Sequence, residues 1–216
     1  MTADKITRFW LIRHALVNEI SRSVLYGTLD VKLCEDRLRE EKPLYSALAA
    51  RLPRPALWVV TPLSRTRDTA RALFEAGYTE QPLTVETGLS EQELGDWQGL
   101  AHAALPPLLA EAAHPFWPIS GAERPPRGES MEDVIARVGP ALERLAREHH
   151  GEDVIAISHG GAIRAAMAYA AGLTGHQSLH FAIQNVSLTL LERSAQGWRV
   201  TGVNETWTSG PKDEIG

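Results

Sequence analysis

The chain has 216 residues, of which 44% are hydrophobic and 23% charged, an ordinary globular composition that predicts a single domain over residues 1–216. Its formal net charge of -5 argues against a general nucleic-acid-binding protein, because such a protein needs a basic face. Cys34 is the single cysteine, which excludes a disulfide framework and a multi-cysteine metal site and favours a reducing compartment.

Three short apolar runs predict the centre of the fold. They are rich in β-forming residues and lack polar alternation, as expected for buried central strands. Patterns with a helical period lie between and after them, and such an alternation of strands and helices predicts a layered α/β protein. The expected strands are Phe9–Ile12, Ala56–Val60 and Val154–Ile157, and the expected helices are Lys42–Leu52, Pro62–Glu75, Ser130–His149 and Gly161–Ala171.

Local signals mark two helix starts and one sheet edge. Pro62 suits the first turn of a helix, and Ser130 with Asp133 forms a plausible capping pair. Near the end of the chain, Val186–Glu192 and Trp198–Val203 are β-rich and predict a hairpin at the edge of the sheet. The predicted fold is therefore a three-layer α/β/α sandwich around a mostly parallel sheet with an antiparallel edge strand.

A proline-rich stretch interrupts the pattern before the third predicted helix. It belongs to an expected cap-like insertion at about 101–128, within the single domain. The candidate walls of a substrate pocket lie in or beside this insertion, namely Trp97, Leu100, His102, Phe116 and Trp117. No segment approaches membrane-spanning length and the first apolar run is too short for a secretory signal, so we expect a cytoplasmic protein with no membrane association.

Cations follow each of the three predicted central strands. Arg13 and His14 follow the first, Arg65 lies in the first helical turn after the second, and His159 with Gly160 follows the third. The carboxyl ends of the strands in an open α/β sheet form the ligand-binding edge, so these residues are expected to converge. Alone, each signal is more commonly an ion pair or a solvated helix face. Together they suit a phosphoryl group, because guanidinium forks match phosphate oxygens and a neutral imidazole can attack phosphorus.

Five segments, in order, resemble the motifs of the histidine phosphatase superfamily, the phosphoglycerate mutase-like proteins, and most closely its phosphatase branch. They are LIRHA, TPLSRTRDTA, LSEQELGDWQG, PRGES and SHGGAIR. The resemblance implies that His14 is the nucleophile, that Arg13 and Arg65 bind the phosphoryl group, that His159 donates to its oxygens, and that Glu91 is the general acid and base.

Two further substrate-binding residues are expected, and one of them departs from the family pattern. Gly160 would let the backbone approach the phosphate closely. The family's asparagine in the loop after the first histidine corresponds to Asn18, which lies closer to His14 than usual, so Ser21 or Ser23 are alternatives for this role.

The predicted function is hydrolysis of a phosphomonoester, a small phosphorylated metabolite, through a phosphohistidine intermediate and without a metal or cofactor. A cofactor-dependent phosphoglycerate mutase is the first alternative, although this chain is shorter than typical mutases. A non-catalytic phosphate-binding module is the second, although both His14 and Glu91 are present. The expected partners are the substrate and inorganic phosphate, with a homodimer formed through Ala166–Leu173 and the late hairpin.

Other chemistries are disfavoured. The chain has no GxxxxGK[ST] nucleotide loop, and the residues after Cys34 lack the arginine spacing of a cysteine-based phosphatase. The polar group at His149, His150, Glu152 and Asp153 sits where a helix should end in solvent, which argues against a metal site there.

Overall fold

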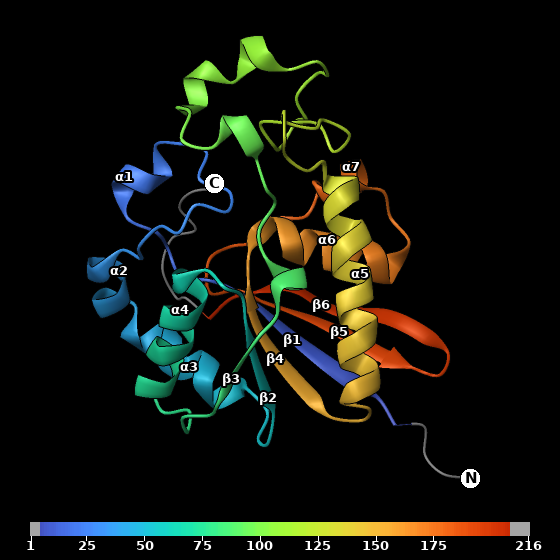
Figure 1. Cartoon of the computed structure of the whole chain (residues 1–216). Coiled ribbons are helices and arrows are strands. Elements are labelled where there is room, and N and C mark those ends of the chain that lie inside the picture. Colours follow the sequence, from blue (N-terminus) through green and yellow to red (C-terminus); the bar gives the residue numbers. More distant parts are fainter. Residues whose placement is uncertain (1–4, 208–216) are drawn as a thin grey trace.

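A computed structural model describes residues 5–207 and shows a six-stranded sheet with helices on both faces (Figure 1). The strands run in the order β3-β2-β4-β1-β5-β6. The first four in sequence are parallel to one another, and the last two form an antiparallel hairpin beside β1, which confirms the predicted fold. The strands are β1 (Thr7–Arg13), β2 (Leu57–Val60), β3 (Leu83–Val85), β4 (Asp153–Ser158), β5 (Leu188–Ser194) and β6 (Gly197–Glu205).

The register of the two central strands places the functional motifs side by side. β1 and β4 pair in parallel up to Arg13 opposite Ser158. The ladder continues one step further, since the backbone N–H of His14 donates to the Ser158 carbonyl at 2.9 Å. His14 and His159 therefore leave the sheet next to each other.

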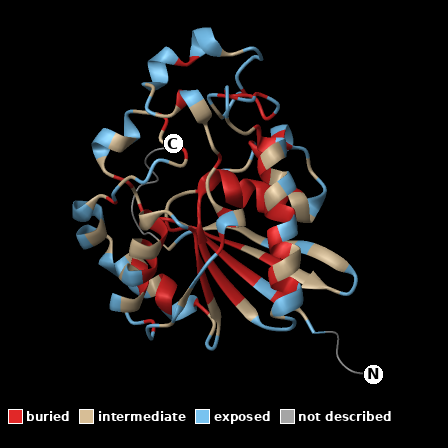
Figure 2. Ribbon diagram, viewed as in Figure 1, coloured by how far each residue is buried: buried red, intermediate tan, exposed pale blue. Residues whose placement is uncertain are grey.

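Helices cover both faces of the sheet and enclose two cores. α5 and α6 pack on one face around Phe9 and Leu142, whereas α3 and α4 pack on the other around Ile12 and Trp58. Figure 2 shows the buried residues concentrated along the central strands and the inner sides of these helices. The helices are α1 (Glu19–Arg22), α2 (Glu35–Glu40), α3 (Lys42–Arg51), α4 (Ser64–Glu75), α5 (Met131–Glu148), α6 (Gly160–Ala171) and α7 (Gly175–Ser178).

Two of the local predictions meet different outcomes. Ser130 and Asp133 form the expected capping box at the start of α5. Pro62, in contrast, lies outside α4, whose N-cap is Leu63. The helix begins later because the carboxylate of Asp30 accepts hydrogen bonds from both the backbone and the side chain of Ser64, which satisfies an otherwise unpaired donor at the helix start.

Residues 101–128 lie above the carboxyl ends of the strands, in green in Figure 1. They contain two short 3-10 helices, η3 (His102–Ala104) and η4 (Pro106–Leu108), joined by loops. Leu105 and Ile119 are buried there in a small cluster with Leu25 and Trp97. Two more 3-10 turns, η1 (Thr87–Leu89) and η2 (Gly95–Trp97), lie in the chain that leads from the sheet to this segment.

One surface expected for a dimer is only partly available. Ala166, Met167 and Ala168 are buried in the chain's own core, so that part of the helix cannot contact a second copy. Residues 169–173 and the β5–β6 hairpin are the parts of the expected surface that stay accessible. Among the described residues, no helix has both the length and the apolar character needed to cross a membrane.

Candidate active site

Five buried side-chain nitrogens lack a hydrogen-bond partner within residues 5–207 and belong to residues at or near the carboxyl edge of the sheet. Buried polar atoms are nearly always paired in proteins, so a group of unpaired ones in one region is a sign of a binding site. All five are cationic or titratable nitrogens, as an anion site requires. They are Arg13 Nε, His14 Nε2, Arg65 Nε, His159 Nδ1 and Arg164 Nη1.

His14 is fully buried and its ring is fixed in one tautomer. Its Nδ1 lies 2.7 Å from the carbonyl oxygen of Ala15, which can only accept, so Nδ1 carries the proton. Burial lowers the pKa of His14 well below 6.5, and the charges of Arg65 and Arg13 lower it further. The ring is therefore neutral at pH 7, with the lone pair at the unpaired Nε2.

A second hydrogen bond holds the backbone of His14. The side-chain amide of Asn185 donates to the His14 carbonyl at 2.8 Å. The next residue, Val186, has φ +59, an uncommon value for a β-branched residue, and its N–H donates to the Arg13 carbonyl at 2.9 Å. Such strain is retained where the surrounding structure imposes it, and here it orients the chain beside the site.

His159 faces His14 from the end of β4. The centroids of the two rings are 5.2 Å apart, with an interplanar angle of 60°. His159 Nε2 lies 2.9 Å from the hydroxyl of Thr61, the residue that follows β2. Burial lowers the pKa of His159 well below 6.5, and the neighbouring His14, Arg65 and Arg13 act in the same direction.

Arg13 and Arg65 are anchored by backbone carbonyls, and the buried Nε of each has no hydrogen-bond partner among the described residues. Arg13 Nη1 donates to the carbonyl of Ile183 at 2.6 Å. Arg65 donates from Nη1 to Leu29 and from Nη2 to Gly27, both at 2.7 Å. Neutral carbonyls orient these guanidinium groups without cancelling their charge, which stays available for a ligand.

Glu91 reaches the start of α6 because Gly161 has no side chain. Its Oε2 accepts from the Gly161 N–H at 3.3 Å. A Cβ on Gly161 would lie only 2.4 Å from Glu91 Oε1, so this close approach requires glycine. The carboxyl group therefore stands beside the first turn of α6, near His159.

Glu129 of the PRGES motif helps to fix the backbone of Glu91 through Arg137. Glu129 binds Arg137 through two nitrogens, Nε at 2.7 Å and Nη2 at 2.9 Å. Arg137 in turn donates to the carbonyls of Gly88, Ser90 and Glu91 at 2.8 to 3.0 Å. These bonds fix the backbone that carries the carboxyl group.

The structure brings together six residues that the sequence pattern singled out, His14, Arg13, Arg65, Glu91, His159 and Gly160. Asn18 does not join them in this structure. Its side-chain oxygen caps α1 by accepting from Ser21 N at 2.9 Å, and its amide donates to the Lys32 carbonyl at 3.3 Å. Whether Asn18 contacts a phosphate thus stays a prediction.

Arg164 is a site residue that the sequence analysis did not assign. It is 3% exposed, and its Nη1 lies 3.4 Å from the position that a Cβ on Gly160 would take. Arg13 Cζ lies 3.5 Å from the same point, so two guanidinium groups adjoin Gly160. The signal available was the last letter of SHGGAIR, which falls on the same side of α6 as its first turn.

The candidate walls divide into buried and exposed residues. The Trp117 ring covers the guanidinium of Arg164, whose Cζ is 4.3 Å from the ring centroid. Phe116, by contrast, is 63% exposed and contacts His114 and His180. His102 is exposed, and its Nε2 donates to the Arg22 carbonyl at 3.1 Å.

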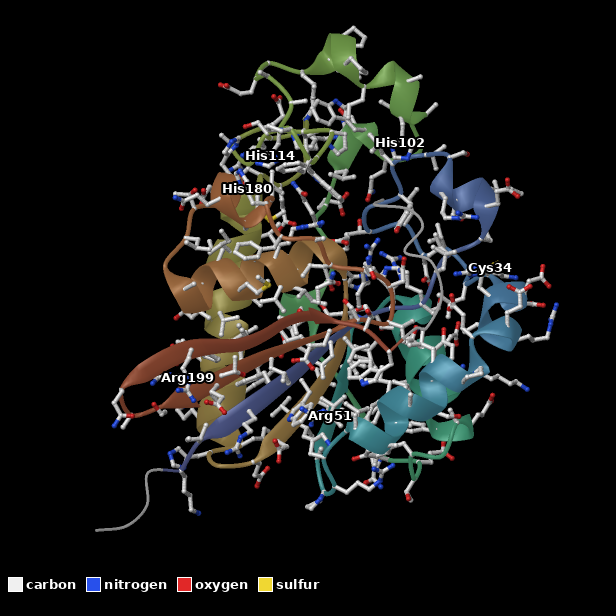
Figure 3. All side chains as sticks on the ribbon, turned by 180° about the vertical axis from the view of Figure 1, so that it is seen from behind. Cys34, Arg51, His102, His114, His180 and Arg199 are labelled. Carbon is white, nitrogen blue, oxygen red and sulfur yellow. The ribbon has the colours of Figure 1, made fainter. Side chains whose placement is uncertain are left out.

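A histidine cluster joins residues 101–128 to the α7 region. His114 Nε2 lies 3.3 Å from His180 Nδ1, and Figure 3 shows the two side chains close together. The His176 ring also adjoins His114, with centroids 4.6 Å apart. In residues 5–207 no group of three or more His, Cys, Asp or Glu side chains has an arrangement suited to a metal ion.

Comparison with known proteins gives concordant results. Residues 9–206 match the histidine phosphatase superfamily (branch 1). A glucosyl-3-phosphoglycerate phosphatase from Mycolicibacterium vanbaalenii is 32% identical over 176 residues, which cover 78% of this chain and 76% of that protein. A metal-independent phosphoserine phosphatase from Arabidopsis thaliana is 28% identical over 163 residues, 75% and 68% of the two chains.

The fold also matches a solved structure with a bound anion. The complex of a mycobacterial glucosyl-3-phosphoglycerate phosphatase with inorganic phosphate has a TM-score of 0.73 at 28% identity. The match covers 94% of this chain and 98% of the mycobacterial chain.

Proposed function

Because the chain belongs to branch 1 of the histidine phosphatase superfamily and is a metal-independent phosphomonoester hydrolase of that family, we propose that His14 Nε2 is the atom that forms its phosphohistidine. One observation carries the proposal. His14 Nε2 is buried, unpaired and unprotonated, and unpaired nitrogens of Arg13, Arg65 and His159 lie around it. An imidazole in this state is a nucleophile that needs no separate base.

In the first step, Nε2 forms a bond to phosphorus while the bond to the leaving oxygen breaks. Arg13 Nε and Arg65 Nε would donate to the phosphoryl oxygens, where negative charge is spread in the transition state. Their carbonyl anchors fix them before the substrate arrives, so little reorganisation is needed during the reaction.

His159 would act as a further donor. We assign the Thr61 hydroxyl as the donor to His159 Nε2, 2.9 Å away. The proton of the neutral ring then resides on Nδ1, the unpaired nitrogen, and can be donated to a phosphoryl oxygen.

Glu91 would transfer the protons of both steps. Its carboxyl group gives a proton to the leaving oxygen, which departs as an alcohol. It then takes a proton from the water that attacks phosphohistidine, and the phosphorus–Nε2 bond breaks to release inorganic phosphate. The contacts with Gly161 N and with the chain held by Arg137 keep the carboxyl group in place for both transfers.

The substrate is a small phosphorylated compound, and the relatives indicate which to test first. Their names state that they act on glucosyl-3-phosphoglycerate and on phosphoserine, and both compounds carry a carboxylate. Residues 101–128 are proposed as the cap over the leaving group, because Trp117 reaches the site from this segment. We also propose a cytoplasmic location. A homodimer is a further proposal, which light scattering would test.

The test is phosphate release from a panel that includes these two compounds, in EDTA, by the wild type, His14→Ala and the control His150→Ala. His150 is exposed and lies at the other end of the sheet, after α5. Only His14→Ala should lose release, and intact-protein mass spectrometry of the wild type after alkaline quenching should show one acid-labile phosphoryl group. A label retained in His14→Ala would contradict the assignment. Isomerisation of 3-phosphoglycerate with bisphosphoglycerate, without phosphate release, would identify a mutase.

A further inference from the structure

We propose that Arg164 binds a carboxylate on the leaving group of the substrate and so selects phosphomonoesters whose alcohol carries a carboxylate. The inference rests on the proposed function, because the leaving group is defined by the reaction at His14. It adds a specificity-determining residue whose role follows from its own contacts.

Arg164 is a buried cation that forms no ion pair in the described part of the chain, where the charge of Glu91 acts on it without direct contact. Its side chain forms none of the ion pairs found in residues 5–207, and its Nη1 has no hydrogen-bond acceptor there. Burial, and to a smaller extent the charge of Arg13, lower the pKa of Arg164 to about 10, so the group is still charged at pH 7. Burying an unpaired charge is costly, which indicates that a ligand supplies the missing anion.

Two contacts fix the orientation of the Arg164 guanidinium group. Its Nε donates to the Phe181 carbonyl at 2.9 Å. One face of the group is covered by the Trp117 ring, a cation–π contact at 4.3 Å. With Nε bonded and one face covered, Nη1 is held beside Gly160, where it can donate to a bound ligand.

Two neighbours, Glu91 and Trp117, support a position of Arg164 on the leaving-group side of the site. Among carboxylates, it is the charge of Glu91 that acts on Arg164, and Glu91 is the proposed acid for the leaving oxygen. Trp117 comes from residues 101–128, the proposed cap on the same side. The phosphoryl group has its own donors in Arg13, Arg65 and His159.

The ligand is a carboxylate because the charge available on this side suits a single negative charge. The other arginines of the cap region are already paired, Arg124 with Asp133 and Arg127 with Asp96. A second phosphate would need several cations, whereas one guanidinium edge matches a carboxylate.

The experiment compares phosphoserine with phosphoethanolamine, which differ only by the carboxylate. In the wild type, kcat/KM should be at least about 10-fold higher for phosphoserine, and 3-phosphoglycerate should exceed glycerol 3-phosphate similarly. Arg164→Met should lower kcat/KM by about 10- to 100-fold for the two carboxylates and by less than about 3-fold for the other two. The control Arg147→Met, at an exposed position of α5, should change none of the four.

Several outcomes would overturn the inference. Equal losses on all four substrates, with weaker competitive inhibition by inorganic phosphate, would assign Arg164 to the phosphoryl group. No loss on any of them would leave it without a ligand. If Arg164→Met does not fold, Arg164→Lys and the preference of the wild type decide, and a wild-type preference below about 3-fold in both pairs contradicts the proposal. Failure of the proposed function is distinguishable, since the wild type would then form no phosphohistidine with any substrate.

Discussion

The buried histidine pair predicts a specific loss of stability in acid. Both His14 and His159 have pKa values lowered well below 6.5 by burial and by the arginines around them. In the unfolded chain the same rings titrate near 6.5. As the pH falls below 6.5, the unfolded state therefore binds protons that the folded state does not, and the free energy of unfolding decreases.

The upper limit of this loss of unfolding free energy follows from the histidine pKa in the unfolded chain alone. Between pH 7.5 and 5.5, a histidine that stays neutral in the folded state removes at most about 1.4 kcal/mol of unfolding free energy. The two rings together remove at most about 2.7 kcal/mol. A double variant, His14→Asn with His159→Asn, lacks both titrating groups and should lose this part of the pH dependence.

The assay is urea unfolding followed by circular dichroism at pH 7.5 and 5.5, for the wild type and the double variant. His114, whose pKa is also lowered by burial, contributes equally to both proteins and cancels in the comparison. Replacing the exposed His150 by Asn in the wild-type background gives the control. If the double variant loses as much stability in acid as the wild type, the two rings are not held neutral in the folded protein and the reasoning is wrong.

Three further variants test the supporting contacts. Gly161→Ala places a Cβ 2.4 Å from Glu91 Oε1 and should lower kcat about 100-fold for alkyl phosphates. It should change kcat little for p-nitrophenyl phosphate, because that leaving group needs no acid. Equal losses on both substrates would argue against Glu91 as the acid. Thr61→Val removes the 2.9 Å contact with His159 Nε2 and should lower kcat/KM about 10-fold while the thermal midpoint changes little; unchanged kinetics would show that His159 needs no orientation. Ser130→Ala breaks the capping box of α5 and should cost about 1 kcal/mol in urea unfolding with kcat unchanged, whereas an unchanged midpoint would mean that the cap contributes nothing.

The central strands could be predicted because burial on both faces leaves a direct trace in the sequence. Phe9–Ile12 and Val154–Ile157 are continuous apolar runs, and both lie inside observed strands. β3 has three residues, two of them exposed, so its sequence carries no such trace. Its position comes from pairing with β2, a tertiary contact that a local pattern does not encode.

The candidate site shows the same division. His14, Arg65 and His159 follow predicted strands, so their convergence could be inferred from the order of elements alone. Thr61 and Asn185 act through single hydrogen bonds to His159 and His14, and the sequence around an isolated threonine or asparagine does not indicate such a partner. Their roles became visible only when the sheet register placed them beside the histidines.

The sequence does not indicate the burial of Arg164, for a different reason. A lone arginine within an alanine-rich helix is ordinarily read as a solvated position, yet the side chain is 3% exposed because Phe181 and Trp117 enclose it. Its burial depends on residues 17 positions later and 47 positions earlier, which no window along the helix includes. A cation on an otherwise apolar helix that lines a site is therefore worth testing for burial before it is assigned to the surface.

The unpaired nitrogens and the lowered histidine pKa values have one physical cause. Burial removes water from both histidines, which disfavours their protonated forms, and the uncompensated charge of the buried arginines disfavours a proton there further. The same arrangement keeps the attacking nitrogen of His14 free of a proton and leaves donors without acceptors until an anion arrives. A bound phosphoryl group supplies acceptors to those donors and negative charge to those cations at once. The destabilisation that the folded protein tolerates at this edge is thus the property that makes the edge bind and react with a phosphate ester.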